Sequence, residues 1–199
     1  EILNLKAKVK AMEKKVSTSS SVTFFGDSGD RNRDETQAPT EAMIQKEIVP
    51  ALLKVVADKN IHADIRGGAL IALSRCGGGK AHVKTFFEVA KAGSGEDKVV
   101  QESAILALGI LQIKEPEIRQ FLIGLVDNMD IPFRARCFAA ISLGLLRDND
   151  PTVLACLERF LNGRESTPDV PVCALLTIGM IGDKAQVPTL MTWLDAGRI

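Results

Sequence analysis

One apolar pattern recurs four times along this 199-residue chain at a fixed spacing. Its clearest member is an alanine that returns after every 35 residues, at Ala69, Ala104, Ala139 and Ala174. Three flanking columns keep the same spacing: Ile65, Val100, Ala135 and Val170; Ala72, Ala107, Ser142 and Thr177; and Leu73, Leu108, Leu143 and Ile178. Offsets of 4, 7 and 8 residues from the first column place all of these on one side of a helix. The repeat therefore predicts four equivalent helices that are packed in the same way.

A second helical pattern precedes each of these segments. Its columns, again 35 apart, are Ile48, Val83, Ile118 and Val153; Ala51, Phe86, Phe121 and Cys156; Leu52, Phe87, Leu122 and Leu157; and Val55, Ala90, Leu125 and Phe160. The i, i+3, i+4, i+7 spacing is typical of an amphipathic helix. Turn-forming residues such as Asp58-Lys59-Asn60 and Gly93-Ser94-Gly95 separate the segments. Each repeat is therefore expected to be a pair of helices joined by a short polar turn.

The second helix of each pair is unusual in two ways. Gly109, Gly144 and Gly179 share one column near its end. A glycine inside a helix costs about 1 kcal/mol relative to alanine, so three in one column indicate close packing or helix termination. The second helix is also apolar over most of its circumference. We therefore expect it to be covered by its own first helix and by the neighbouring repeats.

The start of each second helix carries a pattern that resembles HEAT and HEAT-like, armadillo-type repeats. It reads Ile65-Arg66…Ala69, Val100-Gln101…Ala104-x-x-Ala107-Leu108-Gly109, Ala135-Arg136…Ala139 and Val170-Pro171…Ala174, with Pro171 where an arginine is common. The resemblance covers about 48–195 and implies an all-α fold, a right-handed α-solenoid of about four and a half helical pairs. The expected pairs lie near 48–77, 83–112, 118–147 and 153–182, with a half-pair at 186–195. Together they form a repeat domain that covers 42–199. Because a capping helix would have a more polar outer face, we expect the sequence to end inside the array.

The first 41 residues differ from the repeats. In residues 1–16 the apolar positions Ile2, Leu5, Val9, Met12 and Val16 alternate spacings of 3 and 4, as in a short amphipathic, coiled-coil-like helix. Such a helix would dock on the repeats or mediate self-association, while its narrow apolar stripe makes a membrane-surface helix the weaker alternative. Residues 17–41 are expected to be a polar, flexible linker in which Phe24 and Phe25 are a candidate docking point. Thr40 is the candidate N-cap of the helix that follows.

Charge and cysteine content restrict the function classes. The 25 basic residues balance the 25 acidic ones, so no overall field favours nucleic acid or an anionic membrane. No apolar run approaches the length of about 18–20 residues that spans a bilayer. The four cysteines contain no C-x-x-C pair and are interpreted as small buried hydrophobes, with a Cys137–Cys173 disulfide left open. Unpaired cysteines and the lack of a visible signal slightly favour a cytoplasmic location, although the start at Glu1 suggests a leader or anchor removed or left out.

Three motifs that resemble functional sites lack an essential part. Asp30, Asn32 and Asp34 alternate as in a calcium loop, but Glu35 stands where the turn needs glycine. Gly77-Gly78-Gly79-Lys80 lacks the preceding glycine and the following Ser or Thr of a phosphate-binding loop. The only histidines, His62 and His82, have no nucleophile or carboxylate at catalytic spacing. We therefore predict no catalytic residue, no cofactor and no metal site.

The sequence thus favours a non-catalytic protein-binding scaffold or adaptor, acting alone or as a subunit of a larger assembly. The candidate partner-binding residues are Arg66, Gln101, Glu102, Arg136, Phe24 and Phe25. For Glu102 the default expectation is a surface charge. The alternative function is a HEAT-like enzyme, or a lyase-type or chaperone-like protein acting on a small molecule or a cofactor-bearing protein. The lack of converging acid–base groups argues against it.

Overall fold

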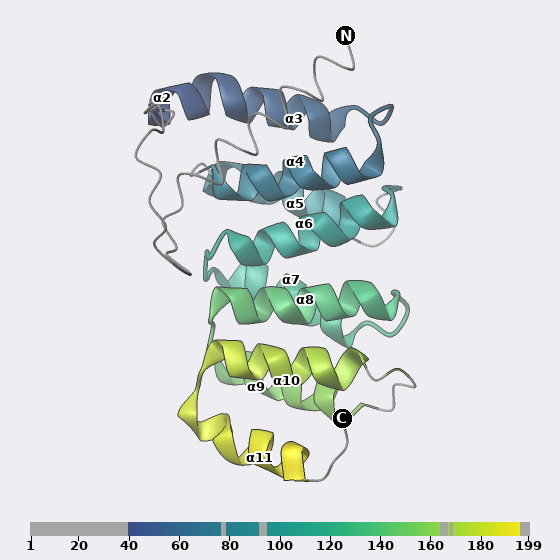
Figure 1. The fold of residues 1–199 in the computed structure, drawn as a ribbon, viewed down its shortest axis with the longest axis vertical. Helices are drawn as coiled ribbons and strands as arrows, with labels where there is room; N and C mark the ends of the chain where they lie inside the picture. Colours follow the sequence, from purple (N-terminus) through teal and green to yellow (C-terminus); the bar gives the residue numbers. More distant parts are fainter. Residues whose placement is uncertain (1–39, 77–78, 92–94, 164–166, 168, 196–199) are drawn as a thin grey trace, which may run out of the picture.

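A computed structural model describes residues 40–76, 79–91, 95–163, 167 and 169–195 (Figure 1). Every regular element within these ranges is helical, which confirms the predicted all-α class for this part of the chain. The helix expected over 1–16, the linker up to residue 39 and the calcium-like Asp30-Asn32-Asp34 pattern lie outside the described residues, as do Phe24 and Phe25.

The helices follow one another with the period of the sequence pattern. In chain order they are α2 (Glu41–Met43), the π-helical η1 (Ile44–Ile48), α3 (Val49–Ala57), α4 (Ala63–Arg75), α5 (Gly79–Ala90), α6 (Lys98–Ile110), α7 (Pro116–Asp127), α8 (Phe133–Leu146), α9 (Pro151–Leu161), α10 (Asp169–Ile181), the 3-10 helix η2 (Lys184–Gln186) and α11 (Val187–Asp195). α4, α6, α8 and α10 begin at residues 63, 98, 133 and 169, so the successive intervals are 35, 35 and 36 residues.

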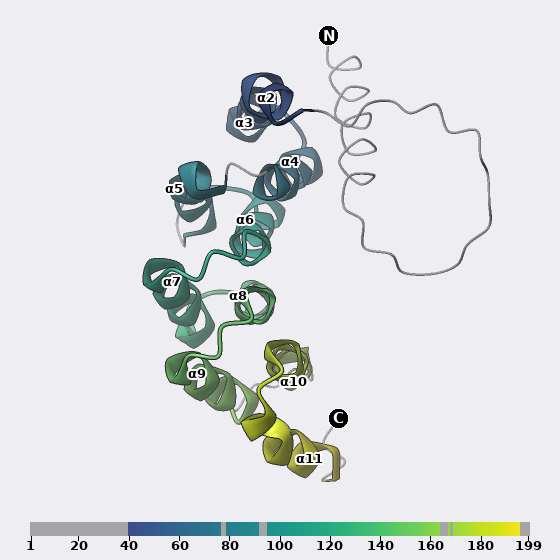
Figure 2. The same ribbon diagram turned by 90° about the vertical axis from the view of Figure 1, so that its left-hand side faces the viewer.

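The helices form two rows, seen one behind the other in Figure 1 and side by side in Figure 2. We call α4, α6, α8 and α10 the inner row and α3, α5, α7 and α9 the outer row. Each inner helix packs against the inner helices next to it and against the outer helix that precedes it in the chain. The two rows follow a gentle curve in Figure 2, with the inner row on the inside.

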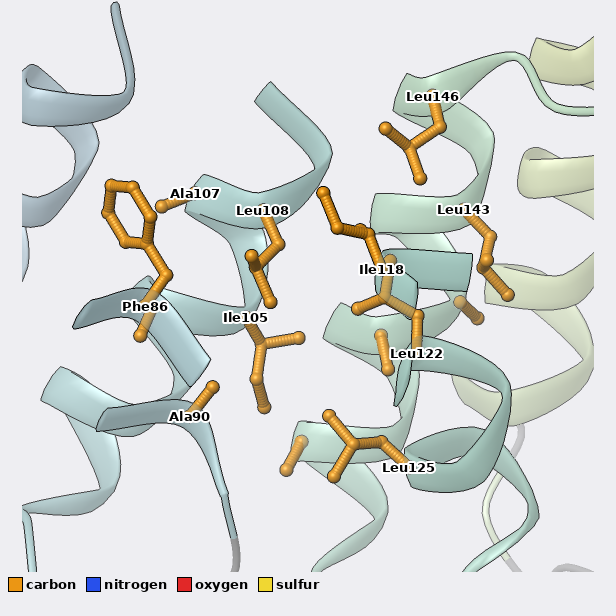
Figure 3. Packing of buried hydrophobic residues seen from close by; sticks show 14 of the residues in the cluster. Phe86, Ala90, Ile105, Ala107, Leu108, Ile118, Leu122, Leu125, Leu143 and Leu146 are labelled. Atoms are coloured by element: carbon orange, nitrogen blue, oxygen red, sulfur yellow. The ribbon is translucent and has the colours of Figure 1, made fainter. Parts of the chain in front are cut away.

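The repeated apolar columns form the core between the rows. Ala69, Ala104, Ala139 and Ala174 are fully buried, at 0% exposure. The absence of a larger side chain at these positions lets adjacent inner helices approach closely. Figure 3 shows how larger residues from α5, α6, α7 and α8, among them Phe86, Leu108 and Leu122, gather in one continuous apolar cluster.

Short polar side chains define where several helices begin. Thr40 caps α2, because its hydroxyl accepts a hydrogen bond from the Met43 backbone N–H at 3.3 Å, as the sequence predicted. Asp97, Asp150 and Asp183 do the same for α6, α9 and η2, at 2.8–2.9 Å. These carboxylates satisfy backbone donors that have no partner inside the helix, so they fix the start of each helix.

Two of the three glycines in the shared column lie where adjacent inner helices approach closely. A Cβ atom built on Gly109 would lie 2.6 Å from the Ser142 Cα, and one on Gly144 would lie 3.1 Å from the Thr177 Cγ2. A Cβ on Gly179 would meet nothing within 4 Å. Close packing, rather than helix termination, therefore explains Gly109 and Gly144.

Candidate functional site

The inner row presents one side away from the outer row, and no residue of that side is buried. We call this surface the inner face. It consists of four positions from each inner helix: Asp64, Gly68, Ile71 and Arg75; Val99, Ser103, Leu106 and Ile110; Arg134, Phe138, Ile141 and Leu145; and Asp169, Cys173, Leu176 and Met180. Within each helix the positions are offset by 0, 4, 7 and 11 residues, which places them along one side. The inner row, which carries this face, lies on the inside of the curve in Figure 2.

Two lines of apolar side chains cross the middle of the inner face. The first line takes one residue from each helix: Ile71, Leu106, Ile141 and Leu176. The second line, one turn further along, consists of Ile110, Leu145 and Met180. Leu176 is 54% exposed and the other six are half-buried. Apolar side chains that remain accessible in a contiguous group are a mark of an interaction surface.

Charged groups lie at the margins of these lines. Asp64, Arg134 and Asp169 occupy the start of three inner helices, and Arg75 occupies the end of α4. An apolar centre with a polar margin is the usual anatomy of a protein–protein interface. Neither line was predicted from the sequence, because the second helix was expected to be covered by its own first helix and by the neighbouring repeats.

The two arginines among the candidate partner-binding residues are buried within the chain. The Arg66 Nε and Nη2 atoms donate to the Val56 carbonyl oxygen at 3.0 and 2.8 Å, and Nη2 also pairs with Glu96 at 2.8 Å. The Arg136 Nε atom donates to the Val126 carbonyl oxygen at 2.8 Å. Each acceptor belongs to the last turn of the preceding outer helix, where backbone carbonyls have no partner inside the helix. Both side chains therefore fasten an inner helix to its outer partner.

Gln101 makes the same connection in the pair between them. Its Nε2 atom donates to the carbonyl oxygens of Ala90 and Lys91 at 3.1 and 2.9 Å, at the end of α5. The column Arg66, Gln101 and Arg136 is thus a ladder of side-chain donors, which Pro171 does not continue. The sequence contained a signal for these contacts: each donor stands about ten residues after the end of the preceding outer helix, so a short turn brings the two together.

Glu102 is buried, so the expectation of a surface charge is wrong. Its side chain is only 11% exposed, and it accepts a hydrogen bond from the Arg134 Nη2 atom at 2.8 Å. The pair joins α6 to α8 at the edge of the inner face. Burying an unpaired carboxylate is costly, so the mostly exposed Arg134 has a structural role as well as a surface position.

The cysteines behave as small apolar residues. All four are free thiols; Cys76, Cys137 and Cys156 are buried and Cys173 is half-buried. Burial raises the pKa of the Cys156 thiol to about 12, and the nearby Asp127 carboxylate adds to the effect. Burial, followed by the neighbouring Cys173 thiol, raises the pKa of Cys137 to about 12. Thiols with raised pKa values are poor nucleophiles at neutral pH.

Because the pKa values of these thiols are raised, we expect the free energy of unfolding to fall at alkaline pH. The unfolded chain releases the Cys156 proton near pH 9, whereas the folded chain keeps it up to about pH 12. Stability is therefore lost as the pH rises through this window, by about 1.4 kcal/mol per pH unit for each such thiol. Urea unfolding at pH 8 and pH 10 measures this loss of stability. The variant Cys156→Val, which removes the thiol and nearly keeps its volume, is expected to lose less stability than the native chain, and an equal loss would contradict the assignment.

The described residues contain no group of three His, Cys, Asp or Glu side chains placed to hold a metal ion. His62 serves as the N-cap of α4, where its Nδ1 atom accepts the Asp64 backbone N–H at 3.3 Å. Among the helices that the structure describes, none has the length and apolar character to cross a membrane. No protein-family model matches this chain, and a search of curated proteins finds no match to it.

Proposed function

We propose that this chain is a HEAT-like α-solenoid that acts as a non-catalytic protein-binding scaffold, with the inner face as its binding surface. The observation that supports this most is the pair of apolar lines across the inner row. They repeat with the period of the fold, so an extended partner meets an apolar residue of the first line on each inner helix and one of the second line on α6, α8 and α10. The binding contacts are assigned to these lines rather than to Arg66 and Arg136, whose donors are engaged within the chain.

The charge and the apolar character of the inner face favour a protein partner over other ligands. The chain has no net charge, and the inner face mixes acidic and basic residues, so nothing concentrates phosphate groups on it. Burial of half-exposed Leu, Ile and Met side chains releases about 25 cal/mol per Å² of apolar surface. The charged margin then contributes orientation and association rate more than affinity.

One substitution on the inner face and a matched one on the outer row test this proposal. Ile141→Asp places a charge at the centre of the inner face, and Ala155→Asp places the same charge on the exposed side of α9 in the outer row. We expect Ile141→Asp to weaken capture of protein partners from a lysate of the source cells by at least about tenfold, because an unpaired buried carboxylate costs about 1–3 kcal/mol or more. Ala155→Asp is expected to capture them as the native chain does.

Thermal unfolding followed by circular dichroism is the control, and we expect it to find both variants folded at the assay temperature. Equal capture by Ile141→Asp and the native chain would remove the inner face from the proposal. A native chain that captures no protein at all would remove the scaffold function itself.

A further inference from the structure

The two apolar lines have a spacing that suits one kind of occupant. Packed helices lie about 8–10 Å apart, so successive side chains of each line are separated by about that distance. In an α-helix, residues seven positions apart are separated by about 10.5 Å along the axis. A helix with a heptad pattern, laid across the inner row, therefore places one apolar side chain over each inner helix. Its second apolar column is offset by three or four residues, about 5 Å along the axis, so those side chains lie between successive inner helices.

This chain carries a segment with that pattern. Ile2, Val9 and Val16 are seven residues apart, and Leu5 and Met12 form the second column at the same interval. The five lysines of the segment all fall at other positions. We propose that residues 1–16 bind as a helix across the inner face of their own chain, with Ile2, Val9 and Val16 over α6, α8 and α10. The inference rests on the same surface as the proposed function and adds a regulatory occupant to it.

The length of the intervening chain supports binding within one molecule. Residues 17–39 separate the segment from Thr40, and apart from Val22, Phe24 and Phe25 they are mostly polar and rich in Ser and Asp. A flexible linker of this length spans roughly 24–29 Å on average. Four helices packed about 8–10 Å apart span a similar distance, so the tether reaches the inner face without being stretched. Its effective concentration is in the millimolar range, well above that of a second copy in dilute solution.

Docking of this segment makes a definite prediction about access to the inner face. An external partner has to displace residues 1–16 before it binds. Val9→Asp, which weakens the internal helix, is therefore expected to capture at least about threefold more partner than the native chain. Ile141→Asp, by contrast, loses both the internal helix and the partner.

Hydrogen exchange followed by mass spectrometry on the full chain tests the internal contact directly. Backbone amides of residues 3–16 are expected to exchange at least about tenfold more slowly than in an unstructured peptide. Val9→Asp and Ile141→Asp, one from each side of the contact, are each expected to abolish this protection. Ala7→Asp is the matched control, because Ala7 lies on the side of the helix opposite Val9, and it is expected to keep the protection. Protection is also expected to be the same at about 1 and 100 μM protein, since the contact is intramolecular.

Several outcomes would overturn the inference. Unprotected amides in the native chain would show that the segment is not docked, and loss of protection in Ala7→Asp would show that the apolar stripe is not what binds. Protection that rises with concentration, together with a doubled mass in light scattering, would assign the contact to two copies. The experiments distinguish failure of this inference from failure of the proposed function. If residues 1–16 do not dock but partner capture still depends on Ile141, only this inference fails. If they dock but even Val9→Asp captures no partner, the scaffold function fails.

Discussion

Replacing Gly109 with alanine is expected to lower the free energy of unfolding by about 2 kcal/mol, although alanine is the better helix former. The added Cβ atom would lie 2.6 Å from the Ser142 Cα and 2.8 Å from the Ser142 carbonyl oxygen. Both are backbone atoms of α8, so no side-chain rotation relieves the contact and the two inner helices have to move apart. The movement also disturbs the Ser142 hydroxyl, which lies 2.8 Å from the Ile105 carbonyl oxygen. Urea unfolding measures the change.

The glycine column contains its own control. Gly179 occupies the same position in α10, yet a Cβ atom there meets nothing within 4 Å. Gly179→Ala is therefore expected to raise the free energy of unfolding by about 0.5–1 kcal/mol, because it removes only the flexibility of glycine from the unfolded chain. Gly144→Ala should fall between the two, since its nearest neighbour is a side-chain methyl group of Thr177 at 3.1 Å. Equal effects at Gly109 and Gly179 would rule out the close approach of α6 and α8 as the reason for glycine.

The same column shows how far the sequence predicts this fold. The spacing of the alanines and of the leucines next to them was sufficient to predict an all-α chain and the order of its helices, because both helical periods repeat in register. At the glycine column it left close packing and helix termination open, and the structure shows close packing at Gly109 and Gly144. The spacing did not distinguish Gly109 from Gly179, because the distinction depends on which helix lies opposite each of them. That neighbour is set by the packing of whole helices and not by the local pattern.

The candidate site was harder to predict, for two physical reasons. The polar residues at the start of each inner helix were interpreted as partner contacts, whereas Arg66, Gln101 and Arg136 reach back to carbonyl oxygens that the turn brings within range. The apolar lines were interpreted as covered surface, although Leu106 and Ile141 recur at the same 35-residue interval as the core. Periodicity reveals that a position repeats, but the side of the helix that remains uncovered depends on the curvature and layering of the rows.

The second large effect on stability is expected when a member of the ladder of side-chain donors is replaced. Arg136→Met is expected to lower the free energy of unfolding by about 2–3 kcal/mol, while methionine keeps much of the packing of the arginine stem. The change removes the hydrogen bond from Nε to the Val126 carbonyl oxygen at 2.8 Å. It also removes the guanidinium from its place over the Phe160 ring, 5.2 Å from the ring centre. Arg136→Lys keeps the charge but not the planar fork, so we expect a loss between those of the native and the methionine chains.

Arg159→Met serves as the comparison, because Arg159 also bonds to the end of α7 but from the surface. It pairs with Asp127 at 2.7 Å with 57% of its side chain exposed, and exposed pairs of this kind contribute about 0–1 kcal/mol. If Arg136→Met were as mild as Arg159→Met, the buried ladder would not be what fastens the rows together. Partner capture by Arg136→Met, measured per folded molecule, separates the two roles considered for this residue. Unchanged capture with lowered stability assigns Arg136 to the fold, whereas lost capture at full stability would return it to the binding surface.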